Sequence, residues 1–299
     1  MSETLYIIGN GFDLHHGIRS SYKEFGAYLK ARDRETYNVM ERYFDVDTDF
    51  WAEFEGRLAS FDSDTLIEDT SCFLVSYSAE DWSDSFHHDY QYEIDETIKA
   101  ISTTLRARFA EWIRQLRIPD RSEIASLRVP LDPSATFLNF NYTPSLQQLY
   151  GIPDARIRHI HGAASDPDAQ LVLGHGWEPE PQPDPYRFSG DPEDADTRVV
   201  EGQRIIDSYF RDTFKPTANI IQANAAFFAS LSQVERIFVM GHSISSVDHP
   251  YFNEIIRNID ATRVRWKISY RDGIAELQER VKMVGIALNQ AEFAHLPDF

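Results

Sequence analysis

The chain has 299 residues and a formal net charge of −19, with 48 acidic residues against 29 lysines and arginines. Its hydrophobic fraction of 42% is that of a globular protein and excludes a disordered or fibrous chain. The acidic surface repels phosphate backbones, so general binding to nucleic acid is disfavoured. The single cysteine, Cys72, excludes an intrachain disulfide and a multi-cysteine zinc site. Since the sequence also has no signal peptide and no apolar run of membrane-spanning length, we expect a cytoplasmic protein with no membrane partner.

The N-terminal segment predicts a buried strand followed by a tight turn. Leu5-Tyr6-Ile7-Ile8 is a short apolar run, and Gly9-Asn10-Gly11 ends it. Ser21 and Glu24 then have the spacing of a capping box, which opens a helix to about Arg32. Glycines in such a turn let the backbone approach an anionic group, so the turn favours a nucleotide phosphate.

Residues 36–117 form a segment of a different character. Apolar residues recur there at spacings of three and four, for example at Trp51, Phe54 and Leu58. This period predicts helices, and we interpret the segment as an acidic helical insertion. Between these helices, residues 62–95 carry many carboxylates interleaved with aromatic residues, and they form either an ordinary solvated surface or a docking face for a partner.

The remaining chain alternates between strand and helix patterns. We expect strands at 135–140, 156–162, 171–173, 236–240 and 264–270, and helices at 145–150, 198–231, 249–259 and 274–284. The alternation predicts a doubly wound, mostly parallel α/β sheet in a single domain spanning residues 1–299. The segment 174–196 is rich in Pro, Asp and Gly, and is either a lid loop or a surface loop without a function of its own.

Small polar clusters follow nearly every expected strand. Ligands of parallel sheets bind beyond the carboxyl ends of the strands, so these clusters should meet in one crevice. Taken singly, the glycine pair is only a tight turn, since Leu14 stands where a dinucleotide fingerprint has its third glycine, and each histidine is an ordinary structural residue. The clusters are Gly9–Asp13, Asn141–Thr143, His161–Gly162, Gly174–Gly176 and Gly241–Ser243.

The sequence Ile8 to Ile18, IGNGFDLHHGI, followed by Ser21-Tyr22 and Phe25, resembles the N-terminal signature of the AbiH family. Later segments fit the same family: Phe140-Asn141-Tyr142-Thr143, His159-Ile160-His161-Gly162 and Leu173-Gly174. The resemblance implies a role in phage defence by abortive infection. It also implies a phage-derived trigger or partner protein, and a homo-oligomer is possible.

A more remote resemblance is to sirtuin-like NAD-binding domains. It rests on four motifs in the same order: Gly9, Gly11, Gly17 and Ile18; Asn141 with Leu146; His161-Gly162; and Gly241-His242-Ser243-Ile244 with Val247. The chain departs from the pattern at Asp13, Arg19 and Thr143, and it has no four-cysteine zinc ribbon. The resemblance implies a sirtuin-like fold and NAD chemistry, whereas deacylation is not expected.

This second resemblance implies hydrolysis of NAD at the nicotinamide–ribose bond, with NAD as substrate and no cofactor. His161 is the expected general base, and Asn141 would hold the ribose or the attacking water. Asp13 would orient a ribose or stabilise the cation, or would simply cap the helix. Gly9, Asn10, Gly11 and Phe12 would bind the phosphates, and Gly241, His242 and Ser243 the far end of the nucleotide.

Two other functions compete with an NAD hydrolase. One is a sensor that binds a nucleotide signal without turning it over. The other is a metal-dependent nuclease, for which His159, His161, His175 and Asp13 are conceivable ligands. Their spacing is not diagnostic, and we expect no metal. A nuclease also needs a basic groove, which the acidic composition does not support.

Overall fold

The computed structural model describes residues 3–79, 86–179 and 196–299, so most of the expected lid loop, residues 180–195, lies outside the described residues. The chain forms two compact units. Unit 1 comprises Met1–Glu24, Ala110–Val172 and Pro216–Phe299, and unit 2 comprises Phe25–Phe109 and Leu173–Lys215. Among the described residues, no helix combines the length and apolarity needed to cross a bilayer.

Unit 1 is built on a six-stranded sheet in the order β3-β2-β1-β4-β5-β6, and all its strand pairs are parallel. This confirms the predicted α/β fold. Strand order reverses at β1, which is the arrangement of dinucleotide-binding folds. The strands are β1 (Thr4–Ile8), β2 (Thr136–Asn139), β3 (Ile157–His159), β4 (Arg236–Met240), β5 (Arg265–Tyr270) and β6 (Ala291–His295).

The central strand β1 is apolar along its length because both faces of the sheet are covered. All five of its residues are buried, as expected for a strand inside a parallel sheet. On one face the ring of Tyr6 stacks between Phe137 of β2 and Phe238 of β4, at centroid distances of 4.9 and 5.0 Å. These side chains align β1 with both of its neighbours.

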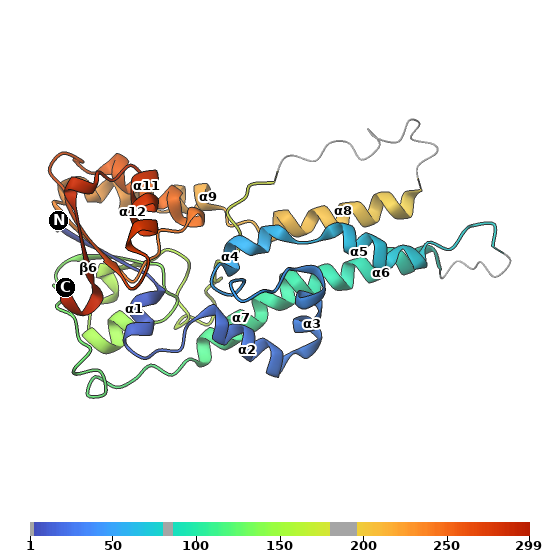
Figure 1. Ribbon diagram of the computed structural model, residues 1–299, viewed down its shortest axis with the longest axis horizontal. Coiled ribbons are helices and arrows are strands. Elements are labelled where there is room, and N and C mark those ends of the chain that lie inside the picture. The colour runs from blue at the N-terminus through green and yellow to red at the C-terminus, as the bar shows by residue number, and fades with distance from the viewer. Residues whose placement is uncertain (1–2, 80–85, 180–195) are drawn as a thin grey trace. The chain divides into compact units, whose positions relative to one another are not determined.

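Helices cover the two faces of the sheet separately (Figure 1). Buried residues of α10, α11 and α12 pack in one core cluster with Leu5 and Ile7 of β1. Phe12 of α1 and Leu146 of the π-helix Leu146–Tyr150 pack in the other cluster with Tyr6 and Ile8. The helices of unit 1 are α1 (Asn10–His15), α2 (Tyr22–Arg32, shared with unit 2), the end of α7 (Leu105–Gln115), α9 (Thr217–Ala223), α10 (Ala225–Ala229), α11 (His249–Asn258) and α12 (Ile274–Met283).

The strand predictions differ from the structure at the margins of the sheet. The expected strand at Leu171–Leu173 is wrong: these residues form no strand, although Val172 N–H donates one hydrogen bond to the carbonyl of His161 at 2.9 Å. Residues Leu171 and Leu173 are buried in a loop, which gives the same short apolar run. The edge strand β6 was not predicted, and β3 ends at His159, earlier than expected.

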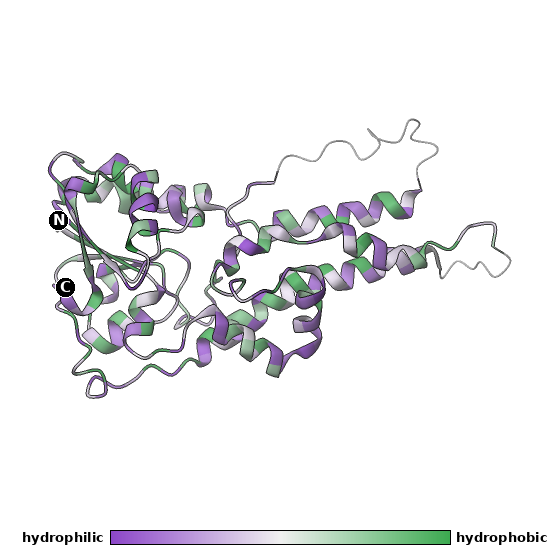
Figure 2. Ribbon diagram, in the orientation of Figure 1, coloured by the Kyte–Doolittle hydropathy of each residue, from purple (hydrophilic) through white to green (hydrophobic). Residues whose placement is uncertain are grey.

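Unit 2 is helical, and α6 and α8 lie side by side in it (Figure 1). Figure 2 shows apolar and polar stripes along α8, and its buried residues include Val200, Gly202, Ile206 and Tyr209. A Cβ on Gly202 would lie 2.5 Å from the ring of Tyr90, so a glycine lets the two helices approach. The other elements are α3 (Arg34–Tyr43), α4 (Phe54–Arg57), α5 (Ser63–Thr70), α6 (Phe86–Lys99), the π-helix Ala100–Thr104 and α8 (Thr197–Asp212).

Unit 2 also contains a buried ion pair. Lys215 Nζ lies 2.6 Å from Glu55 Oε2, and the lysine side chain has no exposed surface. A lysine so fully buried is stable only when its charge is compensated, so this pair fixes the loop after α8 against α4 within the unit.

Candidate functional site

The glycine turn after β1 brings two strand-end loops of unit 1 together. α1 begins at Asn10 directly after the strand, and Gly11 N–H donates a 2.7 Å hydrogen bond to the carbonyl of Gly241, just past β4. A Cβ on Gly9 would lie 2.6 Å from His242 Cα, and one on Gly11 would lie 2.8 Å from Gly241 Cα. Close backbone approach therefore requires both glycines. The N–H of Gly9 also donates within the chain, to the last carbonyl of β4 at 3.0 Å.

The two other residues of this turn that we assigned to phosphate binding make internal contacts. Asn10 Nδ2 donates to the carbonyl of Ser20 at 3.0 Å, and the Ser20 hydroxyl donates back to Asn10 Oδ1. Phe12 is fully buried, with its ring 4.4 Å from that of His16. Burial lowers the pKa of His16 to about 4, and Tyr150 donates its hydroxyl to Nε2 of this neutral ring at 2.7 Å. These residues anchor α1.

Asp13 is a buried carboxyl group held by hydroxyl donors from the loop after β2. Its two oxygens accept hydrogen bonds from Thr143 Oγ1 at 2.5 Å and Ser145 Oγ at 2.6 Å. Burial raises the pKa of Asp13 to about 6, although the hydrogen bonds from Ser145, Thr143 and Asn141 act to lower it. The alternative that Asp13 caps a helix is wrong, because Gly9 occupies the N-cap of α1.

Asn141 ties the loop after β2 to the glycine turn. Its Nδ2 donates to the carbonyl of Gly9 at 3.1 Å, and its backbone N–H donates to Asn139 Oδ1 at 3.0 Å. His159 contacts this loop as well, with Nδ1 3.0 Å from the Asn141 carbonyl oxygen and Nε2 3.0 Å from Gln147 Nε2. Burial lowers the pKa of His159. Because β3 ends at His159, the strand alternation that would place it beside His161 does not continue.

Two histidines and one carboxylate meet beyond the ends of β3 and β4. Asp248 Oδ2 lies 3.4 Å from His242 Nε2, and its Oδ1 lies 3.9 Å from His161 Nε2. All three residues are buried, with exposed fractions of 3% for His161, 6% for His242 and 9% for Asp248. We call these three residues the imidazole–carboxylate cluster. It combines a carboxylate with two imidazole rings, each of which can both donate and accept a hydrogen bond.

The backbone after β4 fixes the ring of His242. The N–H of Ile244 donates to His242 Nδ1 at 2.9 Å, which requires a lone pair on that nitrogen. Ile244 adopts a φ of 49°, in the left-handed region that β-branched residues avoid. The residue with the strained backbone is thus the one that orients the histidine. Strained backbone conformations commonly occur at functional sites.

Aromatic rings enclose the cluster. The ring of Phe140 lies 4.4 Å from that of His242 and 5.3 Å from that of His161, edge-on to both. Tyr251 of α11 packs 5.5 Å from His161. Such surroundings lower the local dielectric constant and strengthen electrostatic interactions among the three charged or polar groups.

The remaining predicted site residues lie outside the cluster. Ser243 is exposed, and its carbonyl accepts a hydrogen bond from Arg280 at 3.2 Å. Gly241 has a φ of 68° and serves the close contact with α1. His175 belongs to unit 2, where it is fully buried beside the rings of Phe210 and Phe214. Within the described ranges, no group of three or more His, Cys, Asp or Glu side chains could hold a metal ion.

Asp248 is the member of the cluster that the sequence patterns did not reveal. It precedes His249-Pro250 at the start of α11, where an aspartate is ordinarily a helix cap. Its side chain makes no capping hydrogen bond. That departure is visible only in the structure, although an aspartate just before a helix that follows Gly241-His242-Ser243 was a usable signal.

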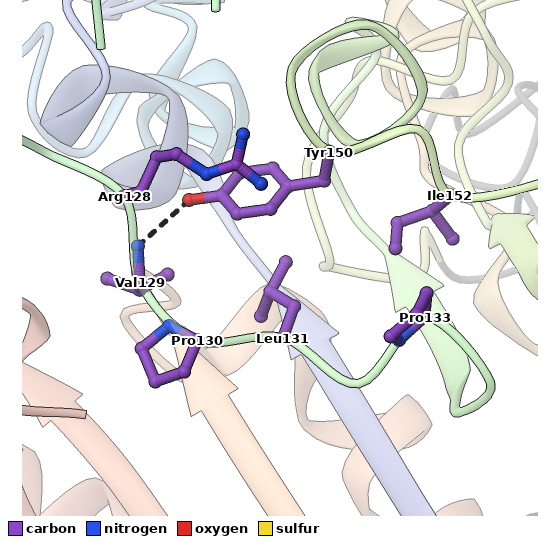
Figure 3. A pocket seen from close by; sticks show the side chains of 7 residues that line it. All are labelled: Arg128, Val129, Pro130, Leu131, Pro133, Tyr150 and Ile152. Carbon is purple, nitrogen blue, oxygen red and sulfur yellow. Dashed lines mark hydrogen bonds between the residues drawn. The ribbon is translucent and has the colours of Figure 1, made fainter. Parts of the chain in front are cut away.

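A hollow in the surface of unit 1 lies elsewhere (Figure 3). It measures about 470 Å³ and includes Arg128, whose guanidinium carbon lies 4.7 Å from the centre of the Tyr150 ring. None of its lining residues belongs to the predicted site. They are Arg128, Val129, Pro130, Leu131, Pro133, Tyr150 and Ile152.

Comparison with known proteins gives one family. The family model described as "Bacteriophage abortive infection AbiH" matches residues 5–270, a range that runs from the second residue of β1 to the end of β5 and includes the whole imidazole–carboxylate cluster. A search of curated proteins finds no match.

Proposed function

Since the chain belongs to the AbiH family of bacteriophage abortive infection proteins, we propose that it acts in phage defence by hydrolysing NAD at the nicotinamide–ribose bond. One observation carries the proposal: the imidazole–carboxylate cluster lies beyond the carboxyl ends of β3 and β4, in a parallel sheet with the strand order of dinucleotide-binding folds. A small-molecule substrate also suits a net charge of −19 better than nucleic acid does.

The chemistry requires one base and no acid. The bond between ribose C1′ and the nicotinamide nitrogen breaks, and its electron pair neutralises the positive charge on that nitrogen. Water adds to C1′ and gives one proton to His161, so the products are nicotinamide, ADP-ribose and a proton. An imidazole suits this transfer because a ring nitrogen with a lone pair can accept a proton, and a buried site holds the ring in one orientation.

Asn141 and Asp13 support the substrate-binding turn in this proposal. Asn141 bonds the carbonyl of Gly9, and Asp13 bonds Thr143 and Ser145 across the same two loops. Both side chains therefore hold the loops after β1 and β2 in register. The close approach of Gly9 to His242 brings the backbone of His242 beside the glycine turn after β1, where it would face a bound nucleotide.

The test is NAD turnover by the purified protein, with cellular NAD measured by mass spectrometry after induction. We expect His161→Ala to lower turnover by about 100-fold to 10,000-fold, the usual effect of losing a positioned acid–base group. His295→Ala is the matched control, since His295 is an exposed histidine of β6 in the same unit. It should retain the wild-type rate.

The same preparation should be incubated with labelled RNA and DNA. Unchanged NAD in cells for which the wild-type protein is toxic contradicts the hydrolase proposal. Cleavage of the labelled strands would then support a nuclease, and intact strands a sensor.

A further inference from the structure

We propose that Asp248 is a shared acceptor that positions both imidazoles of the cluster, and that it makes Nδ1 of His161 the atom that takes up the proton. The proton-accepting role rests on the proposed function. The shared-acceptor role does not, because it concerns the hydrogen positions of the protein alone.

The argument starts from His242, whose protonation is fixed by the backbone. Its Nδ1 accepts the N–H of Ile244 at 2.9 Å, so a neutral ring carries its hydrogen on Nε2. That nitrogen lies 3.4 Å from Asp248 Oδ2. The strained φ of Ile244, 49°, is the backbone conformation that delivers its N–H to this ring. His242 is thereby oriented by Ile244 on one side and Asp248 on the other.

The second oxygen of the same carboxylate faces the other histidine. Asp248 Oδ1 lies 3.9 Å from His161 Nε2, a distance that a small rotation of either side chain closes to a hydrogen bond. Contacts of this kind are often long in a protein without substrate and shorten when it binds. A hydrogen on Nε2 leaves the lone pair of His161 on Nδ1, which is the basic atom of the ring.

Asp248 has the support that a buried carboxylate needs. Ser245 Oγ donates to Oδ2 at 3.2 Å. The residue also occupies the N-cap position of α11, where the helix dipole favours negative charge. Phe140 touches both imidazole rings, so neither ring is free to turn away from the carboxylate.

Only a carboxylate serves two donors in this place. Asp and Glu present two acceptor oxygens, whereas Asn presents one oxygen and an NH2 group that donates. Asp248→Asn therefore deprives at least one ring of its acceptor with almost no change in volume. Asp248→Glu keeps both acceptors and the charge. The two variants separate the acceptor role from packing.

The experiment records ring ¹⁵N spectra of histidine-labelled protein, together with NAD turnover. The variants are Asp248→Asn, Asp248→Glu and the control Asp272→Asn, an aspartate whose side chain is 85% exposed. We expect Nε2–H rings for His161 and His242 in the wild type, Asp248→Glu and the control, and a changed signal for at least one ring in Asp248→Asn. We also expect Asp248→Asn to lower kcat by roughly 100-fold or more with little change in KM.

Several outcomes overturn the proposal. One is a wild-type spectrum with the hydrogen of either ring on Nδ1, which decides the matter even if Asp248→Asn does not fold. Another is a folded Asp248→Asn protein with unaltered ring signals or unaltered kcat. A wild type with both Nε2–H rings but no NAD turnover supports the positioning role and contradicts the proposed function, so the two failures are distinguishable.

Discussion

Asp13 should make the free energy of unfolding fall as the pH rises, whereas most aspartates have the opposite effect. Burial raises its pKa in the folded chain to about 6, against the ordinary value of 3.8. The folded state then binds the proton more tightly than the unfolded state. The resulting stabilisation is complete below pH 3.8, and it is lost as the pH rises through 6.

The size of the effect follows from these two values. The difference between about 6 and 3.8 corresponds to about 3 kcal/mol in the free energy of unfolding, since each pKa unit is worth about 1.4 kcal/mol. Solvent screening does not reduce the figure, because the residue is only 1% exposed. The hydroxyl donors Thr143 and Ser145 keep it from being larger, since they stabilise the ionised form.

The assay is urea denaturation of the wild type and Asp13→Asn at several pH values between 4 and 8. Asparagine stays neutral, so the difference in unfolding free energy between the two proteins should change by about 2 kcal/mol over this range, with the wild type relatively weaker at high pH. Asp272→Asn, at an exposed position, controls for the general charge of the chain. If the unfolding free energies of the wild type and Asp13→Asn changed with pH in parallel, the raised pKa of the buried Asp13 carboxyl would be refuted.

Two further substitutions test the packing of each unit. Gly241→Ala should leave most of the protein unfolded by circular dichroism, because a Cβ there would lie 2.0 Å from the backbone nitrogen of Phe12. Gly17 also has a positive φ, but a Cβ there would have no atom within 4 Å. Gly17→Ala should therefore lower the free energy of unfolding by only about 1–2 kcal/mol. Equal stability of the two variants would contradict the close contact. Glu55→Leu should lower the free energy of unfolding by about 3–5 kcal/mol in urea, because it leaves the charge of Lys215 buried without compensation, and adding Lys215→Met should restore most of the loss. A double variant as unstable as the single one would count against a buried pair.

The sequence predicts the centre of the sheet better than its margins. The strands β1, β2 and β4 are mainly apolar because both faces of the sheet are covered, whereas β5 alternates polar residues with Trp266, Ile268 and Tyr270, and both patterns are visible locally. The edge strand β6 has exposed Glu292 and His295, which weaken any strand pattern. The run at Leu171–Leu173 has the composition of a buried strand, but it packs as a loop, and no local period distinguishes the two.

The candidate site is predicted in the same uneven way. Asn141, His161 and His242 were found because residues after parallel strands share one edge, which is a rule of topology. Asp248 was not, since its importance comes from contacts with two histidines that are distant in sequence. Motif matching also assigned Asn10 a ligand, whereas its side chain bonds Ser20. Motifs identify positions, but they do not say which partner a side chain takes.

The order of strands in unit 1 has a consequence for how the protein emerges from the ribosome. β1 is made first, yet its partners Phe137 and Phe238, both beside Tyr6, follow about 130 and about 230 residues later. At roughly 5–20 residues per second, this apolar strand waits tens of seconds for its second neighbour. During that interval it offers an unpaired edge that invites aggregation. Production of this protein should therefore depend on chaperones that shield its first strand during synthesis.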